Sequence, residues 1–140
     1  NSIYLARQGF LVYGLDISAV AIDKAREWAS KEGLMDRLWF GVGDVSQMEF
    51  RDDFFDAAID ILTINFVKER RRYVAEISRV LKPGGYLLVE ALGEGGEHGI
   101  PRDELEWLFS PFFKIMEIEE FSANWMGSPA KHYRMLAENR

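Results

Sequence analysis

Residues 81–89, which read Leu-Lys-Pro-Gly-Gly-Tyr-Leu-Leu-Val, decide the fold class of this chain. Apolar residues at helical spacing run up to this stretch. Pro83 then forbids a helix from continuing, because proline lacks the backbone N–H and clashes with the preceding turn. Gly84 and Gly85 turn the backbone, and an apolar run follows. The stretch therefore predicts a helix, a sharp turn and a buried strand in succession.

The same alternation of elements extends outward from this stretch. We expect strands at residues 10–15, 38–42, 54–62 and 86–92, and helices at residues 19–32, 67–81 and 101–109. Strands that alternate with helices imply an α/β fold with a mostly parallel sheet and helices on both faces. Residues 113–121 and 131–138 read as two more strands with no helix between them. They predict a C-terminal antiparallel hairpin.

Composition limits the classes of function. The 140 residues fit one domain spanning 1–140, and 48% hydrophobic content suffices for a sizeable core. A net charge of -6 argues against nucleic acid as a partner, because phosphate binding needs clustered Lys and Arg. No cysteine is present, and the two histidines lack metal-ligand spacing, so we expect no metal. No membrane-spanning run or signal peptide is evident, and we expect a cytoplasmic protein.

Carboxylates close two of the expected strands. Residues 14–16 (Gly-Leu-Asp) end the first with Asp16, and Asp44 follows the second. Ligands of parallel sheets bind at the carboxyl ends of the strands, where a carboxylate such as Asp16 can accept both ribose hydroxyls of a nucleoside. The alternatives are structural. Asp16 suits the start of a helix, and Asp44 suits a turn.

The strand ends at Asp16 and Asp44, followed by the Lys-Pro-Gly-Gly turn at residues 82–85, resemble in this order the class I S-adenosylmethionine-dependent methyltransferases, which have a Rossmann-like fold. The resemblance implies that Asp16 binds the ribose and that Ile17 packs on one face of the adenine. It also implies that Asp44 accepts a hydrogen bond from the adenine amino group, while the Val45 amide donates to the ring. S-adenosyl-L-methionine is then the cofactor, and we expect methyl transfer to a small-molecule acceptor.

Four further residues are candidates by the same resemblance. Asp60 lies in the third expected strand and can orient the methionine amino group of the cofactor or the acceptor. Asn65 and Phe66 follow where acceptors approach. His98, in the glycine-rich residues 93–99, can act as a base near the acceptor. Asp60 and His98 are therefore the catalytic candidates. Helix capping or core packing is the alternative for each residue.

One part of the family pattern has no counterpart. The family's first strand and the glycine-rich loop that holds the methionine part of the cofactor should come before Asn1. Residues 2–9 read as the end of a helix closed by Gly9, so we expect the sequence to begin inside a larger domain. The missing strand would lie between the strands at 10–15 and 54–62. Their unpaired edges predict self-association and poor turnover by residues 1–140 alone.

Two alternatives to a methyltransferase stay open. The first is a non-catalytic, truncated methyltransferase-like fragment. The second is a fragment of a nicotinamide-dinucleotide-binding oxidoreductase, which Asp16 also suits but Asp44 and the turn at Pro83 do not. A titration that compares adenosylhomocysteine with NADH distinguishes the methyltransferase from the oxidoreductase.

Overall fold

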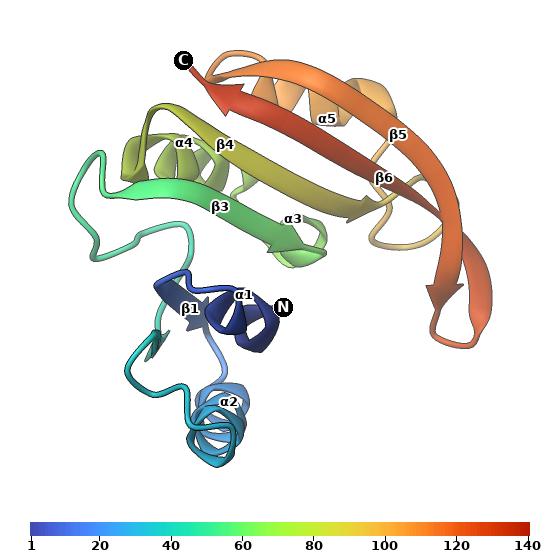
Figure 1. Ribbon diagram of the computed structural model, residues 1–140. Coiled ribbons are helices and arrows are strands. Elements are labelled where there is room, and N and C mark those ends of the chain that lie inside the picture. Colours follow the sequence, from blue (N-terminus) through green and yellow to red (C-terminus); the bar gives the residue numbers. More distant parts are fainter. The chain divides into compact units, whose positions relative to one another are not determined.

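The computed structural model covers residues 1–140, and the chain divides into two compact units (Figure 1). The first unit is Asn1–Met48 and the second unit is Glu49–Arg140. No helix in either unit combines the length and the apolar character that crossing a membrane requires.

The first unit consists of α1 (Ser2–Arg7), β1 (Val12–Asp16), α2 (Ala19–Lys31) and β2 (Leu38–Val42). β1 and β2 are parallel neighbours, so both strands end at the same edge. Ser18 begins α2, and its side chain accepts a hydrogen bond from the Ala21 amide at 3.2 Å. Gly9 follows α1 with a φ of 96°, which is the glycine conformation expected after a helix end.

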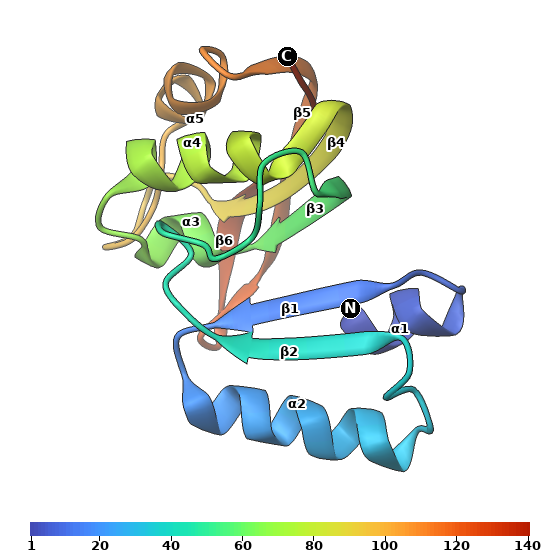
Figure 2. The same ribbon diagram turned by 90° about the vertical axis from the view of Figure 1, so that its left-hand side faces the viewer.

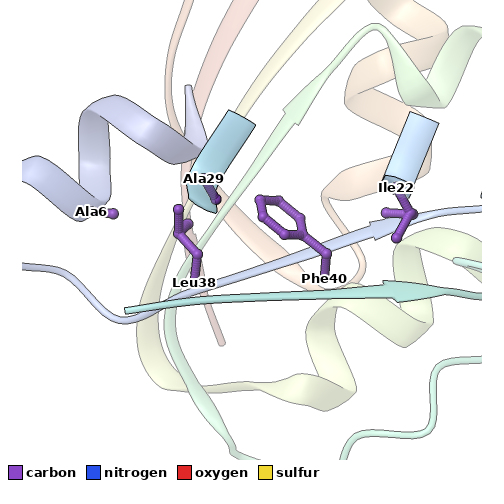
Figure 3. Close-up of a cluster of buried hydrophobic side chains, with 5 residues drawn as sticks. All are labelled: Ala6, Ile22, Ala29, Leu38 and Phe40. Carbon is purple, nitrogen blue, oxygen red and sulfur yellow. The ribbon is translucent and has the colours of Figure 1, made fainter. Parts of the chain in front are cut away.

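The core of the first unit is a small cluster between the two strands and both helices (Figure 3). Leu38 and Phe40 are two residues apart in β2 and therefore point to the same face. Ala6 from α1, with Ile22 and Ala29 from α2, packs against them. The two alanines let the helices approach the strands closely. Both helices thus pack on one face of the strand pair.

The second unit is a four-stranded sheet with three helices. Its elements are β3 (Phe55–Ile61), α3 (Thr63–Phe66), α4 (Arg70–Val80), β4 (Leu81–Leu92), α5 (Arg102–Phe109), β5 (Phe113–Trp125) and β6 (Ser128–Asn139). The strand order is β3-β4-β6-β5, and only β3 and β4 are parallel. The predicted C-terminal hairpin is confirmed. The sheet is mixed, which corrects the expectation of a mostly parallel sheet, because β6 inserts between β4 and β5.

The helices of the second unit lie on one side of its sheet (Figure 2). Leu87, Val89 and Ala91 of β4 are buried there, while the residues between them are more exposed. The expected cover of helices on both faces is therefore not seen within either unit. β1 and β3 belong to separate sheets and do not pair with each other.

The turn at Pro83 differs from its prediction. The expected helix at 67–81 is the shorter α4 (Arg70–Val80), and β4 begins at Leu81 rather than at residue 86. The short helix α3 (Thr63–Phe66) precedes it and was not predicted. Proline disfavours helical backbone in the residue before it, so the chain becomes extended directly after α4. Leu81 already has extended angles, with φ -83° and ψ 138°, and pairs with Phe55. Gly84 then adopts a positive φ of 79°.

The hairpin of β5 and β6 is longer than predicted. Met126 and Gly127 form a two-residue turn with φ values of 50° and 85°, the combination that matches the twist of hairpin strands. The Asn124 side chain accepts a hydrogen bond from the Gly127 amide at 3.0 Å. β6 pairs with β4 only as far as His132, which faces Leu92. Beyond that point the hairpin continues as a two-stranded ribbon.

Candidate functional site

Asp16 and Asp44 lie at one edge of the first unit. Asp16 is the last residue of β1 and faces Val42, the last residue of β2. The Asp16 carbonyl also accepts a hydrogen bond from the Gly43 amide at 3.0 Å. Asp44 follows Gly43 directly. The structure thus brings together the two strand ends that the sequence predicts to carry the acids.

The carboxylate of Asp16 is exposed and only partly engaged. Its Oδ1 accepts a hydrogen bond from the Ser18 amide at 2.8 Å, and its Oδ2 has no hydrogen bond within the protein. The next residue, Ile17, leaves 78% of its surface exposed, which is unusual for a large apolar side chain. A carboxylate with one oxygen free to accept a hydrogen bond, beside an exposed apolar side chain, can bind a polar group and a flat ring of the same ligand.

Asp44 is held in a similar turn. Its Oδ1 accepts hydrogen bonds from the Ser46 amide at 2.8 Å and the Ser46 hydroxyl at 2.7 Å. Ser46 is not among the predicted site residues, although a signal for it exists. Residues 16–18 and residues 44–46 both read Asp, an apolar residue, then Ser. An aspartate that hydrogen-bonds the amide two residues later forms a compact turn and fixes the direction of its own side chain.

Asp60 of the second unit is buried, with 3% of its surface exposed. Its Oδ1 accepts from the Thr63 amide at 2.7 Å, and its Oδ2 accepts from the Ile64 amide at 3.1 Å and the Tyr73 hydroxyl at 2.9 Å. Burial raises the pKa of Asp60, although these hydrogen bonds oppose the shift. Burial and the nearby Asp60 charge raise the pKa of Tyr73 well above its ordinary value. The carboxylate therefore joins the start of α3 to α4.

Asn65 is also buried and engaged with the backbone. Its Nδ2 donates to the Leu92 carbonyl at 3.0 Å and to the His98 carbonyl at 2.8 Å. Its Oδ1 accepts from the Leu92 amide at 2.9 Å. Asn65 thus ties α3 to the end of β4 and to the glycine-rich residues 93–99. Its role as a substrate contact stays a prediction.

Phe66, His98 and Trp125 form an aromatic cluster in the second unit. The ring centroid of Phe66 lies 4.8 Å from that of His98 and 6.0 Å from that of Trp125. These residues come from α3, from the loop after β4 and from the last residue of β5. Phe66 keeps 52% of its surface exposed. The structure brings together Phe66 and His98, which are both predicted site residues, and places Trp125 beside Phe66. It contains no group of three or more side chains able to hold a metal ion.

Comparison with known proteins identifies the family. A family model described as "Methyltransferase domain" matches residues 1–89. A probable chloroplastic tocopherol O-methyltransferase of Oryza sativa subsp. japonica is 30% identical over 113 residues, covering 77% of this chain and 31% of its own length. The sterol 24-C-methyltransferase ERG6B of Gibberella zeae is 42% identical over 77 residues, which cover 55% of this chain and 20% of the relative.

A solved structure agrees with these relatives. The S-adenosylmethionine-dependent methyltransferase from Methanosarcina mazei matches 99% of this chain and 86% of its own, with 25% identity and a TM-score of 0.87. This chain spans about a third or less of the length of the two curated relatives. The family match includes both strand ends of the first unit and extends to Val89 in β4. The chain belongs to the class I S-adenosylmethionine-dependent methyltransferases, whose cofactor is S-adenosyl-L-methionine.

Proposed function

We propose that this chain acts as a methyltransferase, which transfers a methyl group from S-adenosyl-L-methionine to a small-molecule acceptor. The single observation that carries the proposal is the pair of strand-end carboxylates, Asp16 and Asp44, at one edge of the first unit. Nucleosides bind at such edges of parallel sheets.

The residues of this edge fit the adenosine part of the cofactor. Asp16 has a carboxylate oxygen without a protein partner, which can accept from a ribose hydroxyl. Ile17 offers an exposed apolar surface for the adenine ring. We assign the adenine amino group to Asp44 and the ring nitrogen to the Val45 amide. The cofactor supplies a methyl group already activated on a sulfonium, so the protein mainly positions the reactants.

The acceptor side is proposed to lie at the aromatic cluster. Phe66, His98 and Trp125 offer exposed ring surface for an apolar small molecule. The names of two relatives point the same way, since tocopherol and sterol are small apolar ring compounds. The acidic net charge of -6 argues against an RNA or DNA acceptor. Asp60 and Asn65 are proposed to hold the backbone beneath this cluster rather than to contact the cofactor.

The test has a binding arm and a transfer arm. Calorimetry with adenosylhomocysteine and with NADH distinguishes the methyltransferase from the oxidoreductase alternative, and we expect only adenosylhomocysteine to bind. The transfer arm supplies S-adenosyl-L-methionine labelled in the methyl group to small-molecule extracts, RNA, DNA and protein. We expect label in small molecules. Binding without any transfer supports the non-catalytic alternative, and label only in macromolecules contradicts the proposed acceptor class.

A further inference from the structure

His132 of β6 is the one side chain in the structure with buried polar atoms that lack any hydrogen-bond partner. Only 2% of the residue is exposed, and both ring nitrogens are unpaired. The Glu90 carboxylate lies 3.3 Å from Nδ1, but not in hydrogen-bonding alignment. Native proteins pair nearly all buried polar groups, because an unpaired one loses its water without compensation. An apolar side chain at this position would therefore leave the folded protein more stable than His132 does.

The position of His132 relates it to the aromatic cluster. It faces Leu92, the last residue of β4, and therefore lies at the carboxyl end of a parallel strand. On its other side it faces Phe121 of β5, with ring centroids 5.3 Å apart. Trp125 is four residues beyond Phe121, so the two side chains share one face of the strand. Trp125 in turn contacts Phe66. His132 thus lies at the base of the segment that carries Trp125 to the cluster.

The strand pairing provides a route to the ring. Beside His132 the sheet has β4, β6 and β5, but beyond it β5 and β6 pair only with each other up to Trp125 and Ser128. An isolated two-stranded ribbon is marginally stable in water, so it can move more easily than the sheet. The ribbon is therefore the part of the sheet beside His132 that can move, and access of the acceptor to the ring requires that it does.

Glu90 is placed to orient the ring. One carboxylate oxygen lies 3.3 Å from His132 Nδ1, and the other lies 3.7 Å from the Arg134 guanidinium. Arg134 also stacks over Phe121 at 4.5 Å. A carboxylate beside Nδ1 favours the tautomer with a proton on Nδ1, which leaves Nε2 as an acceptor.

We propose that His132 is the base that removes the proton from the methyl acceptor and that Glu90 is its positioning residue. The inference rests on the proposed methyltransferase function and adds a substrate class, namely acceptors with a proton on the atom to be methylated, such as a hydroxyl or an amine. That proton moves to Nε2 as the acceptor atom bonds to the methyl carbon. The carbon–sulfur bond breaks, and its electron pair stays on sulfur. The imidazolium later releases the proton to water.

The decisive variant is His132→Phe, which keeps a ring against Phe121 and removes both unpaired nitrogens. We expect an unchanged or higher melting temperature, unchanged affinity for adenosylhomocysteine, and a fall in kcat of about 100-fold or more, the usual contribution of a general base. The acceptor is the compound labelled in the transfer arm above. His132→Gln, which is smaller, provides a second variant if phenylalanine does not fit, and the same loss of kcat is expected.

Different failures have different meanings. A wild-type protein that transfers no methyl group refutes the proposed function, and this inference falls with it. A wild-type protein that transfers methyl groups, while His132→Phe retains kcat within about 3-fold, overturns this inference alone. A lower melting temperature with activity lost only in proportion to the unfolded protein also overturns it, because that is the result of a structural role.

Glu90→Gln tests the positioning role. We expect kcat to fall by about 10-fold to 100-fold with little change in the KM for S-adenosyl-L-methionine, as when a group that orients a functional residue is lost. The matched control is Glu138→Gln. Glu138 has the same orientation in the sheet as Arg134 but lies at the opposite end of β6, facing Tyr86. A control that loses as much activity as Glu90→Gln contradicts the assigned role of Glu90.

Discussion

Asp16 in the first unit and Asp60 in the second unit both lie at or near the end of a parallel strand, yet their carboxylates have opposite environments. Asp16 is exposed and uses one oxygen in a single hydrogen bond to Ser18. Asp60 is buried and uses both oxygens in three hydrogen bonds. The difference arises from the face of the sheet to which each side chain points, because Asp60 points to the face that the helices cover.

This comparison shows that position along the strand does not by itself define a ligand-binding acid. A carboxylate whose hydrogen bonds are filled by its own protein contributes to stability, whereas one with an unfilled oxygen can bind a ligand. Replacement of Asp60 should therefore change folding first, and replacement of Asp16 should change binding first. Measuring stability and adenosylhomocysteine affinity on the same variants separates the two roles.

The largest expected effect belongs to Asp60→Ala. The change leaves the Tyr73 hydroxyl and two backbone amides buried without a partner. We expect the free energy of unfolding to fall by about 3–5 kcal/mol, because each buried donor left without a partner costs about 1–3 kcal/mol. Urea denaturation followed by circular dichroism measures the change.

Asp56→Ala in the same strand is the matched control. Asp56 is exposed and makes an ion pair with Lys82 at 2.7 Å. Exposed ion pairs contribute little, so we expect a loss below about 1 kcal/mol. Equal losses in the two variants would show that the buried hydrogen bonds of Asp60 do not account for its effect.

Much of the fold is readable from local pattern. The strand at 38–42 is found with its predicted bounds, because its apolar residues lie between turn residues. The pairing of β6 between β4 and β5 is not readable in this way, since it depends on contacts between residues far apart in the sequence. The turn of Met126 and Gly127 escaped notice because methionine is unusual at a positive φ.

The residues of the candidate site were also predictable only where local sequence pattern determines their position. Asp16 and Asp44 could be found because each ends an apolar run, and parallel pairing then places them at one edge. The burial of Asp60 follows from its apolar strand, but its hydrogen-bond partners could not be predicted, since they come from α3 and α4. The sequence also gave no reason to single out His132. Its environment depends on Glu90 and Phe121, which come from other strands.

Asp16→Ala tests whether the exposed carboxylate of the comparison contributes to binding rather than to stability. We expect adenosylhomocysteine to bind less tightly, with a loss of about 1.5–3 kcal/mol of binding free energy, the range for a hydrogen bond to a charged group. The free energy of unfolding should change by less than about 1 kcal/mol, because the side chain is exposed and makes one local hydrogen bond. Calorimetry and urea denaturation on one preparation give both values. Unchanged affinity would remove Asp16 from the cofactor site.

Asp44 should show a graded response. Asp44→Asn keeps an oxygen that can accept from Ser46 and from an adenine amino group, so we expect a loss of binding free energy of about 1 kcal/mol. Asp44→Ala removes both interactions and should lose more. Calorimetry with adenosylhomocysteine measures the two variants side by side. Equal affinity of wild type and Asp44→Ala would place the adenine elsewhere and weaken the comparison with Asp60.

The smallest expected effect is the pH dependence that Asp60 gives to stability. Its pKa is raised above the ordinary value of 3.8, mainly by burial, so the folded state holds the proton more tightly than the unfolded state. The stability gained from this proton is complete below the unfolded pKa and is lost as pH rises through the folded pKa. Asp60→Asn cannot titrate at this position, and its free energy of unfolding should lack this loss. Urea denaturation of wild type and Asp60→Asn from about pH 3 to pH 8 isolates the term, because all other titrating groups cancel in the difference. If wild type instead gains stability relative to Asp60→Asn as pH rises, its hydrogen bonds outweigh burial, and Asp60 behaves as a stabilised carboxylate despite its position inside the sheet.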